Sequence, residues 1–338
     1  MKVIEIAGIE VKPGESKQIK LPVARLYTDN DISMPIHIKR GKIDGPTLFL
    51  SAAIHGDELN GIEIIRRLIN LKLLKNLKGT LIAVPMVNVY GVLNQTRYMP
   101  DRRDLNRSFP GSDKSSLAGR VANVFLTQIV KHCDYGIDLH TGSLHRSNIP
   151  QIRANLDDPE TLALAKAFGV PVLLNANLRD GSLRYAAAEM GIKILLYEAG
   201  EALRFEELSI RAGVKGVINV LRQLGMIPKT SKKVVAEPFI AKNSAWVRAS
   251  ASGIVKYKKQ LGDLVNAKDL LAEIGDPFGK IFDKVTARYS GIIIGKQKIP
   301  LVQEGDAMFH IAYFEDHAEV AEHIEIMQDL YSVSSSTS

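Results

Sequence analysis

The sequence predicts an α/β protein with a mixed sheet and helices on both faces, followed by a small C-terminal all-β barrel or sandwich domain. Two observations predict it. Apolar runs of strand length alternate with segments of helical spacing up to about residue 225, which is the pattern of a sheet covered by helices. After a short polar and basic stretch at residues 228–233, only short β-like runs with glycine turns follow until the tail.

Each element of the predicted α/β domain, residues 1–230, has its own signal. Residues 1–45 alternate short β-like runs with turn residues. Continuous apolar runs, which suit strands buried on both faces, occur at 47–54, 80–87, 135–139, 170–174 and 192–197. Apolar residues recurring three and four positions apart predict helices at 61–74, 116–132, 159–168 and 205–224.

The predicted all-β domain, residues 231–315, contains two similar halves. Each half begins with Ser-Gly-Ile, at 252–254 and at 290–292, and continues through a Gly-Asp turn to a second apolar run. Two such halves predict a pseudo-symmetric barrel or sandwich that resembles a biotinyl/lipoyl-type fold. Lys284 resembles the lysine of a lipoyl hairpin, but its acidic context is incomplete, so we expect it to be unmodified. Residues 316–338 form a tail that is expected to be partly disordered.

Composition narrows the class of protein. The 44 basic and 37 acidic side chains give a formal charge of +7, but they are dispersed and aromatic residues are only 6%, so a nucleic-acid-binding surface is not expected. No run of about 18 apolar residues occurs, and the N-terminus lacks a stretch of signal-peptide length. Cys133 is the single cysteine, which excludes an intrachain disulfide. We therefore expect a cytoplasmic protein without a membrane or nucleic-acid partner.

Two histidines stand where apolar strands end. His55 follows the run at 47–54 and has Glu58 three residues on, with a glycine between them that eases a turn, while His140 follows the run at 135–139. Ends of parallel strands meet at one edge of an α/β sheet. Two imidazoles and one carboxylate suit Zn²⁺ and leave a fourth position open for water. The sequence predicts one Zn²⁺ per chain, held by these three residues, with Asp138 orienting a ligand.

The alternative for each ligand is structural. A lone His-x-x-Glu pair is more often a surface or capping feature, and a strand-end histidine is more often a hydrogen-bonded core residue. Their coincidence at two strand ends favours the metal site. His145, five residues beyond His140 in a polar loop, is left open as a substrate contact.

A polar loop dense in arginine, residues 97–111, follows the second buried run. Asn106 and Arg107 are a pair that can hold a carboxylate, because the guanidinium donates a fork of hydrogen bonds and the amide adds another. Arg102 and Arg103 are expected to be solvated side chains of a charged loop.

A carboxylate also ends the run at 192–197. Glu198 in that position can take a proton from a water on the metal and pass it to a leaving nitrogen. Glu201 lies beyond Gly200 in the turn, and we expect its charge to face solvent.

These motifs together resemble those of the succinylglutamate desuccinylase/aspartoacylase family, whose members are relatives of the zinc carboxypeptidases. The resemblance extends over about residues 45–225, and the β-rich part that follows also looks like that of the family. The motifs that carry it are, in order, His55-x-x-Glu58, Asp104-Leu105-Asn106-Arg107-x-Phe109, Asp138-Leu139-His140-Thr141-Gly142 and Tyr197-Glu198-x-Gly200.

The resemblance implies roles for individual residues. It assigns the zinc ligands to the three residues already selected at the strand ends. It also implies that Arg97 polarises the scissile carbonyl and stabilises the oxyanion, that Asn106 and Arg107 clamp the substrate carboxylate, and that Glu198 is general base and then general acid. Arg97 does not stand out from its neighbouring arginines by sequence alone, and no residue that reads the acyl group can be located.

The expected function is zinc-dependent hydrolysis of the amide in a small anionic N-acyl amino acid. One alternative is a zinc carboxypeptidase acting on peptides or cell-wall fragments. A second is a non-catalytic binding protein that retains the fold, although retention of the whole set of site residues argues against it. The acyl group, the amino acid and the oligomeric state, a homo-oligomer included, are left open.

Overall fold

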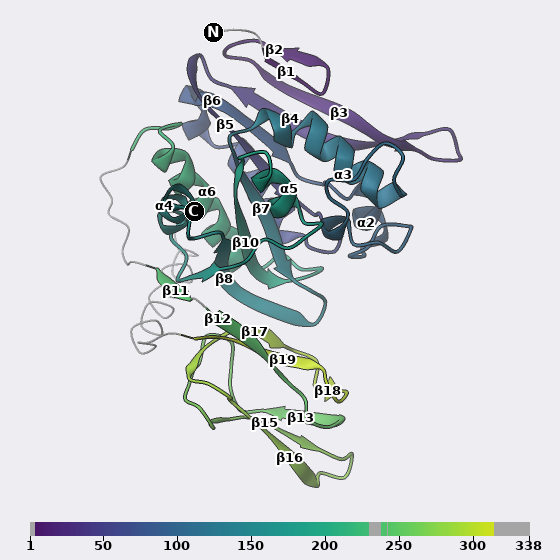
Figure 1. The fold of residues 1–338 in the computed structure, drawn as a ribbon, viewed down its shortest axis with the longest axis vertical. Helices are drawn as coiled ribbons and strands as arrows, with labels where there is room; N and C mark the ends of the chain where they lie inside the picture. The colour runs from purple at the N-terminus through teal and green to yellow at the C-terminus, as the bar shows by residue number, and fades with distance from the viewer. Residues whose placement is uncertain (1–3, 230–237, 242, 314–338) are drawn as a thin grey trace.

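The computed structural model describes residues 4–229, 238–241 and 243–313 (Figure 1). Most strands belong to one large mixed sheet, and a separate hairpin, β1 (Ile4–Ile6) with β2 (Ile9–Val11), precedes it. The first eight strands of the large sheet are β3 (Ser16–Arg25), β4 (Asp31–Arg40), β5 (Ile43–Ala52), β6 (Lys78–Val84), β7 (Tyr135–Gly142), β8 (Arg146–Ala154), β9 (Val172–Asn175) and β10 (Lys193–Glu201).

The centre of the sheet is parallel, in the order β10-β7-β5-β6, and antiparallel strands β8 and β4 flank it. All but the first residue of β7 are buried, as expected for a strand covered on both faces. The continuous apolar runs of the sequence therefore identified the central strands correctly.

Helices cover both faces of this sheet, as predicted. One apolar core joins the strands to α1 (Asn60–Ile69), α4 (Pro159–Phe168) and α6 (Glu207–Gln223). A second core, on the other face, joins them to α3 (Leu117–Gln128) and α5 (Leu183–Ala188). The shorter helical elements are α2 (Val89–Asn94), η1 (Lys72–Asn76), η2 (Leu105–Arg107) and η3 (Val130–His132).

Two parts of the sheet differ from the sequence prediction. The region 1–45 contains two ten-residue antiparallel strands, β3 and β4, as well as the short hairpin. Strand β8 was not predicted, because its buried positions include the polar residues Ser147, Asn148 and Gln151 and it has no apolar run. These polar positions matter because β8 passes beside the site described below.

The C-terminal part is all β, as predicted. Its strands are β11 (Phe239–Ala241), β12 (Asn243–Arg248), β13 (Gly253–Tyr257), β14 (Leu264–Val265), β15 (Leu270–Gly275), β16 (Ile281–Thr286), β17 (Gly291–Gln297), β18 (Leu301–Val302) and β19 (Ala307–Tyr313). A four-stranded sheet, β16-β15-β13-β18, packs on β12, β19 and β17, and both layers contribute to one apolar core (Figure 1).

This arrangement is a sandwich, and its strands do not close into a barrel within the described residues. The two similar halves appear as the antiparallel pairs β13·β15 and β17·β19. Each half also sends a short strand to the other, because β14 pairs with β17 and β18 pairs with β13. Lys284 lies within β16 and not at the tip of a hairpin.

Strand pairing joins the sandwich to the α/β part. Strand β17 pairs with β8, and β11 pairs with β9, so that the large sheet runs on into the sandwich (Figure 1). Most of the predicted linker and the predicted tail lie outside the described residues. Among the helices that the structure describes, none combines the length and the apolar character that a membrane crossing needs.

Candidate active site

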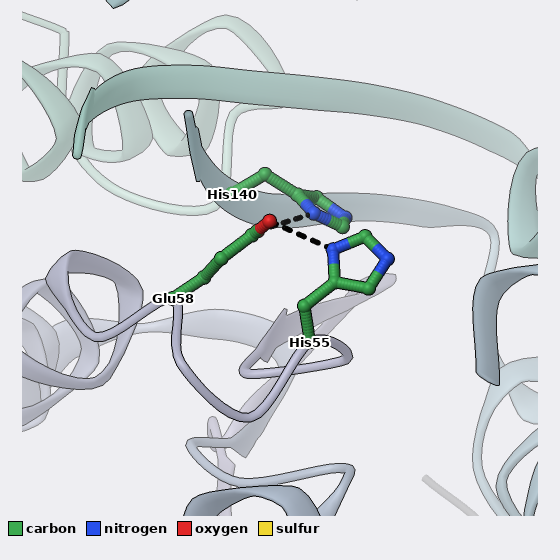
Figure 2. A group of neighbouring side chains, drawn as sticks. All are labelled: His55, Glu58 and His140. Atoms are coloured by element: carbon green, nitrogen blue, oxygen red, sulfur yellow. Dashed lines mark hydrogen bonds and ion pairs between the residues drawn. The ribbon is translucent and has the colours of Figure 1, made fainter. Parts of the chain in front are cut away.

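His55, Glu58 and His140 come together at the carboxyl ends of β5 and β7. One potential ligand atom from each residue lies within 4.8 Å of the others, and all three side chains are at most 5% exposed. Glu58 lies between the two imidazoles, with His55 Nδ1 2.8 Å from Oε1 and His140 Nδ1 2.8 Å from Oε2 (Figure 2). The structure thus brings together the three residues that the sequence predicted as ligands.

The backbone around His55 is shaped for this convergence. Ala53 turns the chain at the end of β5 through a left-handed conformation with φ +52°. Gly56 permits a close approach to α2, because a Cβ there would stand 1.9 Å from the Gly91 carbonyl carbon. The loop from His55 to Glu58 therefore packs directly against α2.

Two further carboxylates hold the outer nitrogens of the imidazoles. Asp104 Oδ1 lies 3.1 Å from His55 Nε2, and Asp138 Oδ2 lies 2.7 Å from His140 Nε2. Asp138 is itself fixed by the hydroxyl of Ser51, which donates to Oδ1 at 2.7 Å. Such partners orient a metal-binding imidazole and turn its other nitrogen toward the ion. The contact of Asp138 with His140 is the one that the sequence indicated, whereas the contact of Asp104 with His55 was not anticipated.

The electrostatics of the three residues are strongly coupled. Burial raises the pKa of Glu58, but the two imidazoles outweigh burial and hold that pKa well below its ordinary value. Burial lowers the pKa of His140, but Asp138 and Glu58 outweigh burial and hold it well above its ordinary value. The cluster therefore retains protons that a divalent cation would displace on binding.

The donor set fits Zn²⁺. Imidazole nitrogens and a carboxylate oxygen are its common ligands, and three protein ligands leave a position for water. The three donors converge on one point, are buried and have outer partners, which are the features expected of a built metal site.

Arg97 lies beside this cluster. Its Nη2 donates to Asp104 Oδ2 at 2.9 Å, and its Nη1 donates to Glu58 Oε1 at 3.3 Å. Burial lowers the pKa of Arg97, but Glu58 and Asp104 outweigh it and raise that pKa, so the guanidinium stays charged. The family resemblance was the only reason to choose Arg97 from the arginines of its loop, and the structure places it at the cluster.

Asn106 and Arg107 lie on η2, at the rim of the same cavity. The side-chain carbonyl of Asn106 accepts from the backbone N–H of Leu183 at 2.9 Å, which leaves its amide NH₂ as the group that can meet a ligand. Burial lowers the pKa of Arg107, the carboxylate of Asp104 offsets part of this effect, and the nearby Arg179 lowers that pKa further. Asp104 already pairs with His55 and Arg97, and no carboxylate of the described residues forms a salt bridge with Arg107, so its charge is available to an anionic ligand.

Glu198 enters the cavity from β10, directly opposite His140 on β7. Its Oε2 accepts a hydrogen bond from Asn148 Nδ2 at 2.5 Å and lies 3.3 Å from Arg153 Nη2. The side chain remains 17% exposed. A carboxylate so held can accept a proton without being sealed from solvent.

All seven predicted site residues line one cavity of about 370 Å³. Four arginines that the sequence did not single out also line it: Arg146, Arg153, Arg179 and Arg184. Burial lowers the pKa of Arg184, and the neighbouring Arg153 adds to this effect. Arg184 donates only to two backbone carbonyls at 3.4 Å and has no carboxylate partner in the described chain. Arginines spaced irregularly on strands and loops leave no sequence pattern, so only the fold could reveal them.

The structure also shows where the other residues considered from the sequence lie. Glu201 is not a solvent-facing charge: it is 1% exposed and pairs with Arg204 and with Lys298 of the C-terminal part. His145 lines a separate cavity with Glu201 and does not line the cavity of the metal cluster. Arg102 and Arg103 are exposed, as expected.

Comparison with known proteins identifies the family of this chain. The sequence model of the succinylglutamate desuccinylase/aspartoacylase catalytic domain matches residues 44–224. The N-alpha-acetyl-L-2,4-diaminobutyric acid deacetylase of Halomonas elongata is 29% identical over 310 residues, which are 87% of this chain and 90% of that protein.

Solved structures share the fold over nearly the whole chain. A succinylglutamate desuccinylase from Silicibacter sp. TM1040 is 25% identical with a TM-score of 0.79, and the match covers 89% of this chain and 96% of that one. The product-bound ectoine utilization protein EutE (DoeB) from Ruegeria pomeroyi has a TM-score of 0.81 at 24% identity, with 90% and 97% covered. These likenesses include the sandwich as well as the α/β part.

Proposed function

The chain belongs to the succinylglutamate desuccinylase/aspartoacylase family, and we propose that it is a zinc-dependent amidohydrolase that cleaves the amide of a small anionic N-acyl amino acid. The observation that carries the proposal is the single cavity. It combines a buried His-Glu-His cluster with Arg97, the Asn106–Arg107 pair and Glu198.

His55, Glu58 and His140 would hold the ion, which when bound polarises the scissile carbonyl and lowers the pKa of a water molecule. Glu198 takes a proton from the attacking water and returns it to the leaving nitrogen, as the new C–O bond forms and the C–N bond breaks. Arg97 stabilises the negative charge that develops on the carbonyl oxygen. The products are a carboxylate and a free amine.

The charge of the cavity supports an anionic substrate. Six arginines and two glutamates line it. Asn106 and Arg107 would bind the carboxylate of the amino-acid portion through charge-assisted hydrogen bonds. The guanidinium of Arg184, which donates only to two backbone carbonyls, offers a second anion contact in the cavity. The deacetylase from Halomonas elongata supports amide cleavage as the reaction. The six arginines of the cavity favour substrates with more negative charge than the diaminobutyric acid derivative in the name of that relative.

The test is a substrate panel on the zinc-loaded protein. N-acetyl and N-succinyl derivatives of glycine, aspartate, glutamate and 2,4-diaminobutyrate would be compared with short peptides, with the released amine measured. We expect turnover of the acyl amino acids, highest for those with two or more carboxylates, and its loss in the His140→Ala variant. Faster cleavage of the peptides would instead identify a carboxypeptidase. Binding without turnover of any member would identify a non-catalytic protein.

A further inference from the structure

The sandwich contributes one side chain to the cavity of the metal cluster. Trp246, on β12, is the one residue of the described C-terminal strands that lines this cavity. It is also the only tryptophan of the chain. A large aromatic side chain from the other part of the molecule therefore forms part of the wall around the candidate catalytic groups.

A row of residues on four neighbouring strands links Trp246 to the candidate base. Trp246 is the register partner of His310, which is in turn the partner of Gly295, and Gly295 is the partner of Asn148. Residues opposite each other in neighbouring strands project from the same face of a sheet. Asn148 donates to Glu198 at 2.5 Å, so the row ends at the carboxylate proposed to move the proton.

The indole is held firmly in this row. Trp246 stacks on the ring of His310 with the centroids 4.6 Å apart and the planes 11° apart. Ser244 Oγ lies 2.9 Å from His310 Nε2. Burial lowers the pKa of His310 to about 3, so that the imidazole is a neutral, flat partner at neutral pH. The guanidinium of Arg146 lies 5.4 Å from the indole on the cavity side of β8.

The row requires a glycine. A Cβ at Gly295 would stand 2.7 Å from Asn148 Oδ1 and 3.1 Å from His310 Cβ. The absence of a side chain at this position lets the stacked pair approach Asn148. The position of Trp246 and that of Asn148, which donates to Glu198, thus both depend on the close packing at Gly295.

The order of strands places Trp246 relative to the candidate catalytic groups. Along β12-β19-β17-β8-β10-β7-β5-β6, the metal cluster lies at β7 and β5. Asn106 and Arg107 pack against the start of α5, because Asn106 accepts from the backbone N–H of Leu183. Trp246 stands at the other end, beyond Glu198 on β10. If the substrate carboxylate is bound at Arg107 and the amide lies at the cluster, the part of the cavity left for the acyl group includes the wall formed by Trp246.

We propose that Trp246 is a specificity-determining residue, whose indole contacts the acyl group of the substrate and limits its size. This rests on the proposed function, because it assumes an N-acyl amino acid with its carboxylate at Asn106 and Arg107. Replacing the indole by a methyl group opens the acyl end of the cavity, whereas phenylalanine retains a flat wall of smaller area.

The test compares Trp246→Ala and Trp246→Phe with the wild type on N-acetyl-, N-butanoyl- and N-benzoyl-glutamate. We expect Trp246→Ala to raise the ratio of kcat/KM for the benzoyl over the acetyl substrate by about 10-fold or more, the usual effect of a change in pocket size, and Trp246→Phe to change it less. Phe282→Ala, which removes a half-exposed aromatic ring from β16 outside the cavity, should leave the ratio unchanged. Unchanged ratios in both tryptophan variants would overturn the proposal.

A second measurement separates this inference from the proposed function. Trp246 is the only tryptophan, so tryptophan fluorescence reports on this residue alone. Titration of the Glu198→Gln variant with N-acetyl-glutamate and N-benzoyl-glutamate should give saturable changes in this fluorescence. If the wild type cleaves no member of the series, the proposed reaction is wrong. The role of Trp246 is then tested by calorimetry, which compares the binding constants of the acetyl, butanoyl and benzoyl compounds for the wild type and Trp246→Ala. Saturable binding by calorimetry without any change in emission would refute contact with Trp246.

Discussion

Replacement of Glu198 by glutamine is the sharpest test of the candidate chemistry. It removes one negative charge and the ability to accept a proton, but it keeps the length of the side chain at the end of β10. In the wild type, the Glu198 carboxylate accepts from Asn148 Nδ2 at 2.5 Å and pairs with Arg153 at 3.3 Å. A glutamine carbonyl can still accept from Asn148, so we expect the side chain to keep its position.

The substitution affects the free energy of unfolding and the activation free energy by different amounts. The ion pair with Arg153 is partly exposed, at 26% and 17% for the two side chains, so its loss should cost at most about 1 kcal/mol of folding stability. Loss of a positioned acid/base group lowers kcat by about 10²–10⁴-fold, which corresponds to about 3–5 kcal/mol in the activation barrier. The increase in the activation free energy should therefore be several times larger than any decrease in the free energy of unfolding.

The assay measures kcat, KM, bound zinc and the unfolding midpoint for the variant and the wild type on one N-acyl amino acid. Glu273→Gln, which removes a carboxylate that pairs with Lys258 in the sandwich, is the matched control. We expect zinc and KM to stay near wild-type values in both proteins and kcat to fall only in Glu198→Gln. A near-normal kcat would show that Glu198 is not the base. Glu201 could not simply replace it, because that side chain lies outside the cavity.

Three further predictions follow from the same geometry. His55→Ala and His140→Ala should each lose most of the bound zinc by elemental analysis, and one zinc per chain in both variants would disprove the ligand set. Arg107→Ala should raise KM more than it lowers kcat, because it removes a contact made in ground and transition states alike, while Arg103→Ala, exposed on the same loop, should change neither. Gly295→Ala should lower kcat with zinc retained, since the new Cβ crowds the asparagine that holds the proposed base; kinetics equal to the wild type would contradict the row across the strands.

Sequence reasoning was most successful where chemistry and periodicity coincide. His55 and His140 each end a continuous apolar run, and the end of such a run is also the end of a buried strand. Glu58 is within reach of His55 because it lies only three positions further along the chain. Glu198 ends a third run in the same way and enters the same cavity. These residues could be chosen from local patterns because their neighbours along the chain define their place in the fold.

The tertiary structure alone decided the remainder of the cavity. The donor that holds Glu198 is Asn148, which is 50 residues away in the sequence and lies on a strand without an apolar run. Trp246 reaches the cavity only because β17 pairs with β8, so its position depends on the register of several strands at once. Such contacts form between segments whose sequences carry no common spacing. A strand periodicity fixes the face on which a side chain lies, but only the pairing of distant strands determines which side chain it meets.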